Sequence, residues 1–218
     1  SVIITGSNTG GKTVTLKTIG LFILMAKAGM FLPCTYAKLY PFKDVFADIG
    51  DSQSILQSLS TFSAHMTNII EILNKSSEES FVLLDEVCAG TDPVEGAVLA
   101  RGILEKLAQK QVTSVITTHY GELKALEYTN NFFKNASVEF NTETLKPTYK
   151  LLIGIPGLSN AISIASNLGL DPDIVNKAKT TLVTQKDPTV AVVEKLQETH
   201  QELSKNLEEA QELKESSL

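Results

Sequence analysis

The sequence predicts an α/β fold with a mainly parallel sheet, followed by a small helical element and an extended C-terminal helix. The first observation is that short runs of β-branched and apolar residues alternate with longer segments whose apolar residues recur at helical spacing. This alternation is typical of α/β folds. The second observation is that the alternation then gives way to a hairpin pattern and to short, increasingly charged helical segments.

The alternating segments follow one another along the chain. Residues 1–5 are β-branched and apolar, which predicts a buried strand, and apolar spacing predicts a helix over 11–28 that stops at Gly29. A domain seldom starts on such a strand, so we expect this chain to come from a longer protein. The later elements are expected as strands at 45–49, 81–84 and 112–118, a helix over 60–74 with Met66, Ile69, Ile70 and Leu73 on one face, and a helix from Pro93 to about Gln111.

The last third of the chain has a different pattern. Two β-rich runs, 136–140 and 148–152, predict a hairpin. Short helices are expected over 159–168 and 172–183, the second capped by Asp171. The stretch 186–218 is charged and has a narrow apolar stripe, which fits either an extended helix that starts a coiled coil or a frayed linker.

Composition excludes several classes of protein. The net charge is −6, with four lysines and eight acidic residues in the segment 186–218, so the chain is not a nucleic-acid binder by charge alone. No apolar run reaches the roughly 18–20 residues of a membrane span, and we expect no membrane partner. Two cysteines, Cys34 and Cys88, have no metal-like spacing and suit a reducing cytoplasm.

The strongest motif follows the first predicted strand. It matches the phosphate-binding pattern G-x-x-x-x-G-K-[ST] at every position: Gly6, Ser7, Asn8, Thr9, Gly10, Gly11, Lys12, Thr13. Glycines let the backbone turn its N–H groups toward phosphate oxygens, and the helix that follows adds its dipole. Lys12 would reach the β- and γ-phosphates, and Thr13 would offer a hydroxyl to Mg²⁺. The motif predicts ATP and Mg²⁺ as cofactors.

A second motif ends the apolar run 81–84. Asp85 at the end of that strand can hold Mg²⁺, and Glu86 beside it can polarise the attacking water. Two adjacent carboxylates would repel each other unless a cation neutralised one of them. The pair is therefore expected to be catalytic and metal-binding rather than an acidic strand end that faces solvent.

His119 ends the predicted strand 112–118 and falls at the same edge of the sheet, where ligands bind in open α/β folds. Here it can donate to the γ-phosphate and join Glu86 as a catalytic residue. The order of phosphate loop, Asp–Glu strand and strand-end histidine fits the ABC-type ATPase plan. It does not fit GTPases, because the sequence lacks their base-reading Asn-Lys-x-Asp.

Hydrolysis of ATP also requires a positive charge or a dipole that stabilises the negative charge of the transition state. The chain has a single arginine, Arg101, in the middle of a predicted helix. A helix N-terminus donated by a second subunit is an alternative, and Ser60 or Thr61 can cap such a helix. Asp92 lies in a turn close behind the Asp–Glu pair. We therefore expect a homodimer whose nucleotide sites are completed in trans.

Together these residues resemble the MutS family of ABC-type ATPases, and its MutS-two branch in particular. The similarity runs from residue 1 to about 185. The segments that carry it are 5–13, 46–51, 59–63, 83–86, 89–93, 117–120 and 154–157.

The resemblance implies roles for several residues. Asn8, Thr9 and the loop glycines would cradle phosphates, Ser60 would contact the partner's nucleotide, and Asp92 would lie in the loop that crosses the dimer. It also implies three segments: an ABC-type ATPase domain without its N-terminal part (1–157), a helical dimerisation element (158–185) and a charged helical linker (186–218). The sequence departs from the family pattern at Ser7 and at Val87–Cys88, where a glycine-containing pair is usual and its loss could stiffen the loop.

The same resemblance implies the wider function. Such proteins carry DNA-facing domains before the ATPase and a small C-terminal nuclease domain, and they control recombination on branched DNA. Action on the ribosome in quality control is an alternative, with rRNA as the bound nucleic acid. A third alternative is a dimerisation module whose truncated site does not hydrolyse ATP.

Overall fold

The computed structural model describes residues 1–6, 10–50, 58–141, 144–157, 161–185 and 199. Side chains at 58–61 and 182–185 lie outside this description. The chain divides into two compact units, Ser1–Gly157 and Leu158–Leu218.

The first unit is built on a six-stranded sheet with the order β2-β3-β4-β1-β5-β6. The strands are β1 (Val2–Thr5), β2 (Asp44–Asp48), β3 (Ser80–Leu84), β4 (Thr113–Thr118), β5 (Lys134–Asn141) and β6 (Lys146–Ile153). All neighbouring pairs are parallel except β5 and β6, which form the expected antiparallel hairpin. The predicted α/β fold with a mainly parallel sheet is therefore confirmed.

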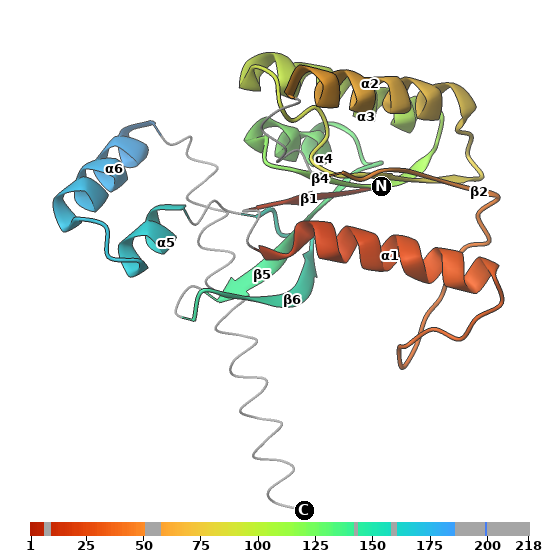
Figure 1. The fold of residues 1–218 in the computed structure, drawn as a ribbon, viewed down its shortest axis with the longest axis horizontal. Helices are drawn as coiled ribbons and strands as arrows, with labels where there is room; N and C mark the ends of the chain where they lie inside the picture. Colours follow the sequence, from red (N-terminus) through yellow and green to blue (C-terminus); the bar gives the residue numbers. More distant parts are fainter. Residues whose placement is uncertain (7–9, 51–57, 142–143, 158–160, 186–198, 200–218) are drawn as a thin grey trace, which may run out of the picture. The chain divides into compact units, whose positions relative to one another are not determined.

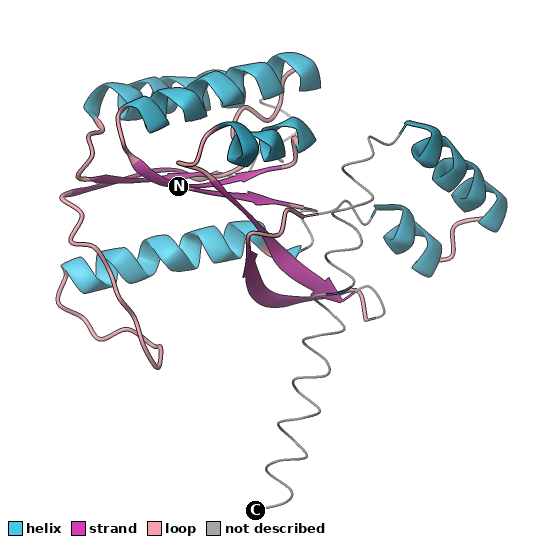
Figure 2. Cartoon of the chain, turned by 180° about the vertical axis from the view of Figure 1, so that it is seen from behind, coloured by secondary structure: helices cyan, strands magenta, loops and turns pink. Residues whose placement is uncertain are grey.

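Helices cover both faces of this sheet (Figures 1 and 2). Helix α1 (Lys12–Lys27) lies on one face, and α2 (Ser58–Lys75), α3 (Pro93–Gln109) and α4 (Leu126–Thr129) lie on the other. Because successive strand residues point to opposite faces, the strands β1, β2, β3 and β4 contribute side chains to two separate cores. The core under α1 contains Ile4, Leu83 and Val115, and the core under α2 and α3 contains Ile3, Val82, Leu84 and Ile116.

Helix α2 differs in one detail from its predicted face. Ile69 is buried and Met66 and Leu73 pack partly against the core, as expected, but Ile70 is 52% exposed. Ile72 is buried in its place. The helix is rotated so that Ile69 and Ile72 point at the sheet, which turns Ile70 by about 100° toward solvent.

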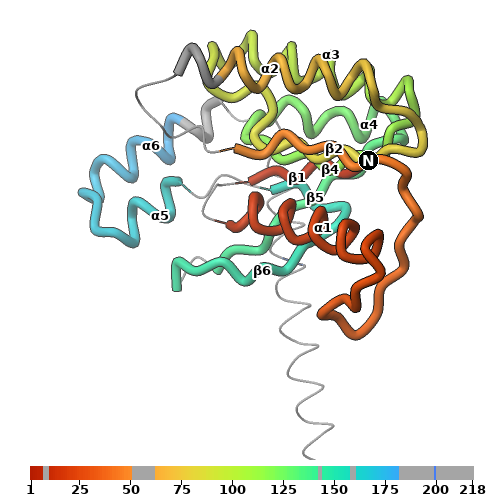
Figure 3. Tube along the Cα trace, turned by 45° about the vertical axis from the view of Figure 1, so that its right-hand side comes forward, coloured from red at the N-terminus to blue at the C-terminus, as the bar shows by residue number. Residues whose placement is uncertain are grey.

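Two short elements follow β4 that the sequence pattern did not predict: a 3₁₀ helix, η2 (Gly121–Ala125), and α4. Each is shorter than the two helical turns that a periodic apolar pattern needs to be recognised. Leu123 and Leu126 are their buried residues. These two leucines belong to the core under α2 and α3. Figure 3 shows the path of the chain through α4 on the same side of the sheet as α2 and α3.

The second unit contains α5 (Ala161–Asn167) and α6 (Pro172–Gln185). Asp171 caps α6 as predicted, because its Oδ1 accepts a 2.8 Å hydrogen bond from the amide of Asp173. The predicted extended helix over 186–218 lies outside the described residues, apart from Thr199. Within the described chain, no helix has both the length and the hydropathy required to cross a bilayer.

A buried turn after β6 touches the start of the phosphate loop. The amide of Gly157 donates to Oγ1 of Thr5 at 2.7 Å. A Cβ added at Gly157 would lie 2.2 Å from the carbonyl oxygen of Thr5 and 2.7 Å from Cα of Gly6. Only glycine allows this approach, so the turn sequence at 154–157 serves packing against β1.

We predict that Gly157→Ala destabilises the protein by roughly 1–3 kcal/mol, because the added methyl group overlaps the backbone of the neighbouring strand. Gly102→Ala is the matched control, since nothing lies within 4 Å of a Cβ at that helical position. The control should stabilise the protein by up to about 1 kcal/mol through helix propensity. Chemical denaturation measures both. Equal effects of the two variants would contradict the packing argument.

Candidate functional site

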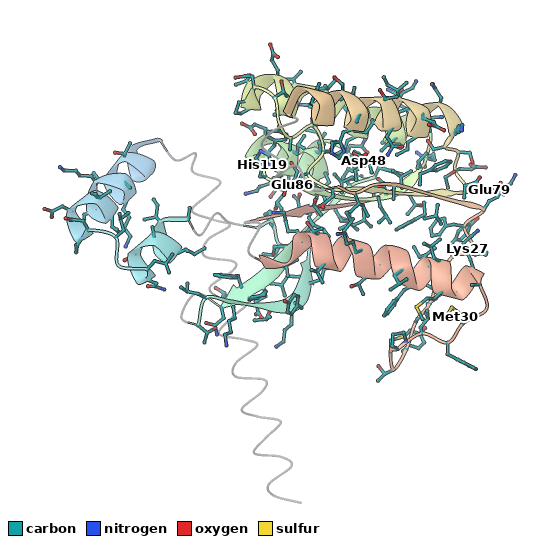
Figure 4. All side chains as sticks on the ribbon, in the orientation of Figure 1. Lys27, Met30, Asp48, Glu79, Glu86 and His119 are labelled. Atoms are coloured by element: carbon teal, nitrogen blue, oxygen red, sulfur yellow. The ribbon has the colours of Figure 1, made fainter. Side chains whose placement is uncertain are left out.

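The predicted site residues meet where the parallel strands end. Gly6 follows β1, Asp85 and Glu86 follow β3, and His119 follows β4. Parallel strands bring their carboxyl ends to one edge of a sheet, where α/β proteins bind ligands. Figure 4 shows Glu86, His119 and Asp48 near this edge, and Glu79 at the opposite end of the sheet.

The phosphate loop is described at its two ends. Gly6 has φ 124° and Gly11 has φ 90°, both in the left-handed region that favours glycine. Gly11 is the N-cap of α1, and Gly10 packs against the backbone of β5. Asn8 and Thr9, predicted to bind phosphate, lie outside the described residues, as does Ser7.

Lys12 is the most deeply buried cation of the site, with 2% exposure. Its Nζ donates to the carbonyl oxygen of Gly6 at 2.7 Å and lies 3.3 Å from Oε1 of Glu86. Burial lowers the pKa of Lys12, and the carboxylate of Glu86 opposes that change. The ammonium group is therefore held inside the loop by a carbonyl and a carboxylate.

Asp85 is held by two hydroxyl groups. Its Oδ1 accepts hydrogen bonds from Oγ1 of Thr13, at 3.2 Å, and from Oγ1 of Thr117. Asp85 is 8% exposed, so these bonds compensate a carboxylate that is largely removed from water. The hydroxyl of Thr13 and the carboxylate of Asp85 are neighbouring hard oxygen donors, the type that Mg²⁺ prefers.

Glu86 lies between two basic side chains. Its Oε2 is 2.7 Å from Nδ1 of His119, and its Oε1 faces Lys12. Burial alone would raise the pKa of Glu86, but the hydrogen bond from His119 and the charge of Lys12 outweigh it and lower the pKa. Glu86 is therefore a carboxylate at neutral pH and can accept a proton.

The loop that carries Glu86 is locally strained. Glu86 has φ 49° and Cys88 has φ 60°, a region that residues with a side chain occupy at a cost of about 1 kcal/mol or more. Cys88 stands where the family resemblance leads one to expect glycine. The hydroxyl of Tyr120 holds this turn by donating to the carbonyl oxygen of Cys88 at 2.8 Å.

The two residues expected to act across a dimer have separate places. Asp92 is the N-cap of α3, with Oδ1 accepting from the amides of Val94 and Glu95. Ser60 lies in the first turn of α2 rather than at its cap, because the helix begins at Ser58. The role of either residue toward a second copy stays a prediction.

Arg101 offers no charge to this site. Its Nε donates to Oε1 of Glu105 within the same helix at 2.8 Å, and its side chain is 55% exposed.

Two residues of the site were missed by sequence reasoning. Thr117 donates to Asp85 and accepts from the amide of Glu86 at 2.9 Å. Its position two residues before His119 could have indicated it. Tyr149 on β6 lies against the loop, since its Cε1 is 3.0 Å from where a Cβ at Gly11 would stand. No local signal marks Tyr149, because only the hairpin brings it there.

No cluster of three or more His, Cys, Asp or Glu side chains that could hold a metal occurs in the part of the chain that the structure describes. Mg²⁺ that binds together with a nucleotide usually takes one or two protein oxygens and completes its shell with phosphates and water. Thr13 and Asp85 offer two neighbouring oxygens of this type.

Residues 2–186 match the family described as MutS domain V, which is most of the chain. The chain belongs to the MutS family. Among similar MutS proteins, "Endonuclease MutS2" of Caldicellulosiruptor bescii is 54% identical over 98% of this chain and 27% of its own length. "Endonuclease MutS2" of Acetivibrio thermocellus is 59% identical over 86% of this chain and 24% of its own length.

These relatives confirm the expected resemblance to the MutS-two branch. The chain spans about a quarter of the length of the curated relatives it matches. The family match over residues 2–186 includes every strand of the sheet and extends through the helices α5 and α6.

We predict that Glu86→Gln makes the free energy of unfolding of this MutS-family chain less dependent on pH in the acidic range. A depressed carboxyl pKa stabilises the folded state fully above the ordinary value of 4.5, and this stabilisation is lost as pH falls through the folded-state pKa. The variant should lose roughly 1–3 kcal/mol at pH 7 and fall less steeply below pH 5. Urea unfolding at several pH values measures this, with the exposed Glu78→Gln as control.

Proposed function

We propose that this chain binds ATP with Mg²⁺ at the loop Gly6–Thr13 and hydrolyses it. One observation carries the proposal. Lys12, Glu86 and His119 form a continuous polar cluster beside Asp85 and Thr13, at the edge of the sheet where the phosphate loop begins. A lysine, a metal-binding pair and a proton acceptor are the parts that phosphoryl transfer to water requires.

Each side chain has a proposed task. Lys12 binds the β- and γ-phosphates, and Thr13 and Asp85 hold Mg²⁺, which would supply charge neutralisation at the phosphates. Glu86 accepts the proton of the attacking water, for which its lowered pKa keeps it ionised. His119 orients Glu86 through Nδ1, and Thr117 fixes the backbone that joins Asp85 to Glu86.

Tyr149 is proposed to contact the base. Its side chain is 59% exposed beside Gly11, and its backbone has φ 61°. A non-glycine residue held in this conformation is strained, which is typical of functional positions. An exposed aromatic ring next to a phosphate loop offers a flat surface on which a purine can stack.

The wider function is proposed from the family. The relatives are named endonucleases and are much longer than this chain. We propose that the longer protein is a homodimer that acts on branched DNA in recombination control, with Asp92 and Ser60 of one copy near the nucleotide of the other. Nuclease activity would belong to a segment other than residues 1–218.

The hydrolysis proposal is tested by phosphate release from Mg-ATP. Lys12→Ala should abolish nucleotide binding and turnover, because the buried ammonium group has no replacement. Glu86→Gln should keep binding and lower kcat by roughly 10²-fold or more, the usual contribution of a general base. Lys17→Ala on the exposed side of α1 is the matched control. Turnover by Glu86→Gln equal to that of the wild type would contradict the proposal.

The base contact is tested by comparing two ligands. Tyr149→Ala should weaken ATP binding by about 1–3 kcal/mol, the usual worth of a stacked base, and leave binding of inorganic tripolyphosphate unchanged. Tyr149→Phe should restore ATP affinity. Tyr128→Ala, which removes a similarly exposed ring on α4, is the control. Calorimetric titration of the wild type and the three variants measures these affinities. If Tyr149→Ala weakened the binding of ATP and of tripolyphosphate equally, stacking would be excluded.

A further inference from the structure

A second polar cluster lies beside the site and has no task in the proposed reaction. It consists of Asp48 at the end of β2 and of His65 and Asn68 on α2. Nδ1 of His65 donates to Oδ2 of Asp48 at 2.8 Å, and Nδ2 of Asn68 donates to Oδ1 at 2.9 Å. Asn68 also donates to the carbonyl oxygen of Ala47 at 3.1 Å. Both carboxylate oxygens are thus used to hold one helix.

This cluster differs from the rest of the contact between α2 and the sheet. The apolar contacts of α2 with the core come from Met66, Ile69, Ile72 and Leu73. Near the end of the helix, Nζ of Lys110 also donates to the carbonyl oxygen of Leu73 at 2.6 Å. Apolar contacts resist separation but tolerate sliding and rotation, whereas two hydrogen bonds to one carboxylate fix the helix in a single register. Asp48 is only 6% exposed, so losing either donor would leave a buried oxygen unpaired.

The same residue is joined directly to the metal-binding strand end. The amide of Asp85 donates to the carbonyl oxygen of Asp48 at 2.9 Å, just beyond the paired residues Asp48 and Leu84. The ring of His65 also lies against the backbone that follows β2, because a Cβ at Gly50 would be 3.1 Å from its Cε1. Asp48 therefore contacts Asp85 through its backbone and α2 through its side chain.

Helix α2 begins at Ser58 and includes Ser60 in its first turn, roughly 7–8 Å along the axis from His65. Its fixed orientation matters for catalysis, because transition-state charge needs a donor and the described residues near Glu86 include no arginine. The donor expected from a second copy is the start of this helix.

We propose that Asp48, His65 and Asn68 are positioning residues that set the orientation of α2 from the metal-binding strand end, so that α2 of one copy serves the nucleotide of another. The proposal rests on ATP hydrolysis as the proposed function. It adds the side chains that connect the metal-binding strand end of one copy to the nucleotide site of another copy. In this proposal the cluster acts through Asp85 and α2 and not by contact with a nucleotide. It transmits the position of Asp85 to the helix.

The test uses this chain and compares two single variants with a control. His65→Ala removes the donor to Oδ2, and His65→Asn restores a donor at the corresponding position of the side chain. Thr67→Ala is the matched control, since Thr67 is exposed on the same helix and donates only to the carbonyl oxygen of Ser63. His65→Ala should lower kcat about ten-fold with KM for Mg-ATP within about two-fold, while His65→Asn and Thr67→Ala remain near wild type.

Mixing variants separates a role in trans from a local one. A heterodimer of His65→Ala and Lys12→Ala has two different nucleotide sites. One site combines the intact phosphate loop of the His65→Ala chain with the intact α2 of the Lys12→Ala chain, and the other site carries both defects. Equal amounts should then recover about a quarter of wild-type activity, because half of the dimers carry one complete site. Recovery by this mixture is not expected from a merely structural defect.

Three results would overturn the proposal. His65→Ala with the kcat of Thr67→Ala would show that the cluster is not needed, and a mixture without recovery would show that it acts only within its own copy. If His65→Ala lowered both the activity and the thermal unfolding midpoint, and His65→Asn restored neither, the cluster would have a role in folding only. A wild-type chain without turnover would instead refute the proposed function, and this inference with it.

Discussion

Two carboxylates stand side by side at the end of a buried strand, and the rest of the site depends on how their charge is compensated. Thr117 contacts both residues, because its hydroxyl donates to the carboxylate of Asp85 and accepts from the backbone amide of Glu86. Lys12 and His119 then take the two oxygens of Glu86. Three strands must end at the same edge for these groups to meet, which is why the order β3-β4-β1 is inseparable from the chemistry.

Much of this arrangement could be predicted from the sequence. The phosphate-loop pattern, the Asp85–Glu86 pair and His119 are local signals, and a parallel sheet necessarily brings strand ends together. The role of Thr117 was not predicted, because threonine is common in β-strands and its presence in a β-rich run indicates no function. Tyr149 was missed for a different reason: its neighbour Gly11 is far away in sequence, and only the hairpin of β5 and β6 brings the two together.

Helix α2 shows where periodicity reaches its limit. The pattern predicted the helix and three of its inward residues, but it placed Ile70 inside and overlooked Ile72. In the observed orientation, His65 and Asn68 also bind Asp48, which lies in β2. Hydrophobic spacing cannot encode such polar contacts, so they could not be predicted before the fold was known.

The strained loop after β3 has a practical consequence for spectroscopy. Cys88 is buried there, and burial raises the pKa of its thiol to about 11, so at neutral pH it stays protonated and shielded from reagents. Cys34, by contrast, is exposed in the connection between α1 and β2. A maleimide dye would therefore attach to this 218-residue chain at Cys34 without any prior mutation, so the chain can carry a single fluorescent label.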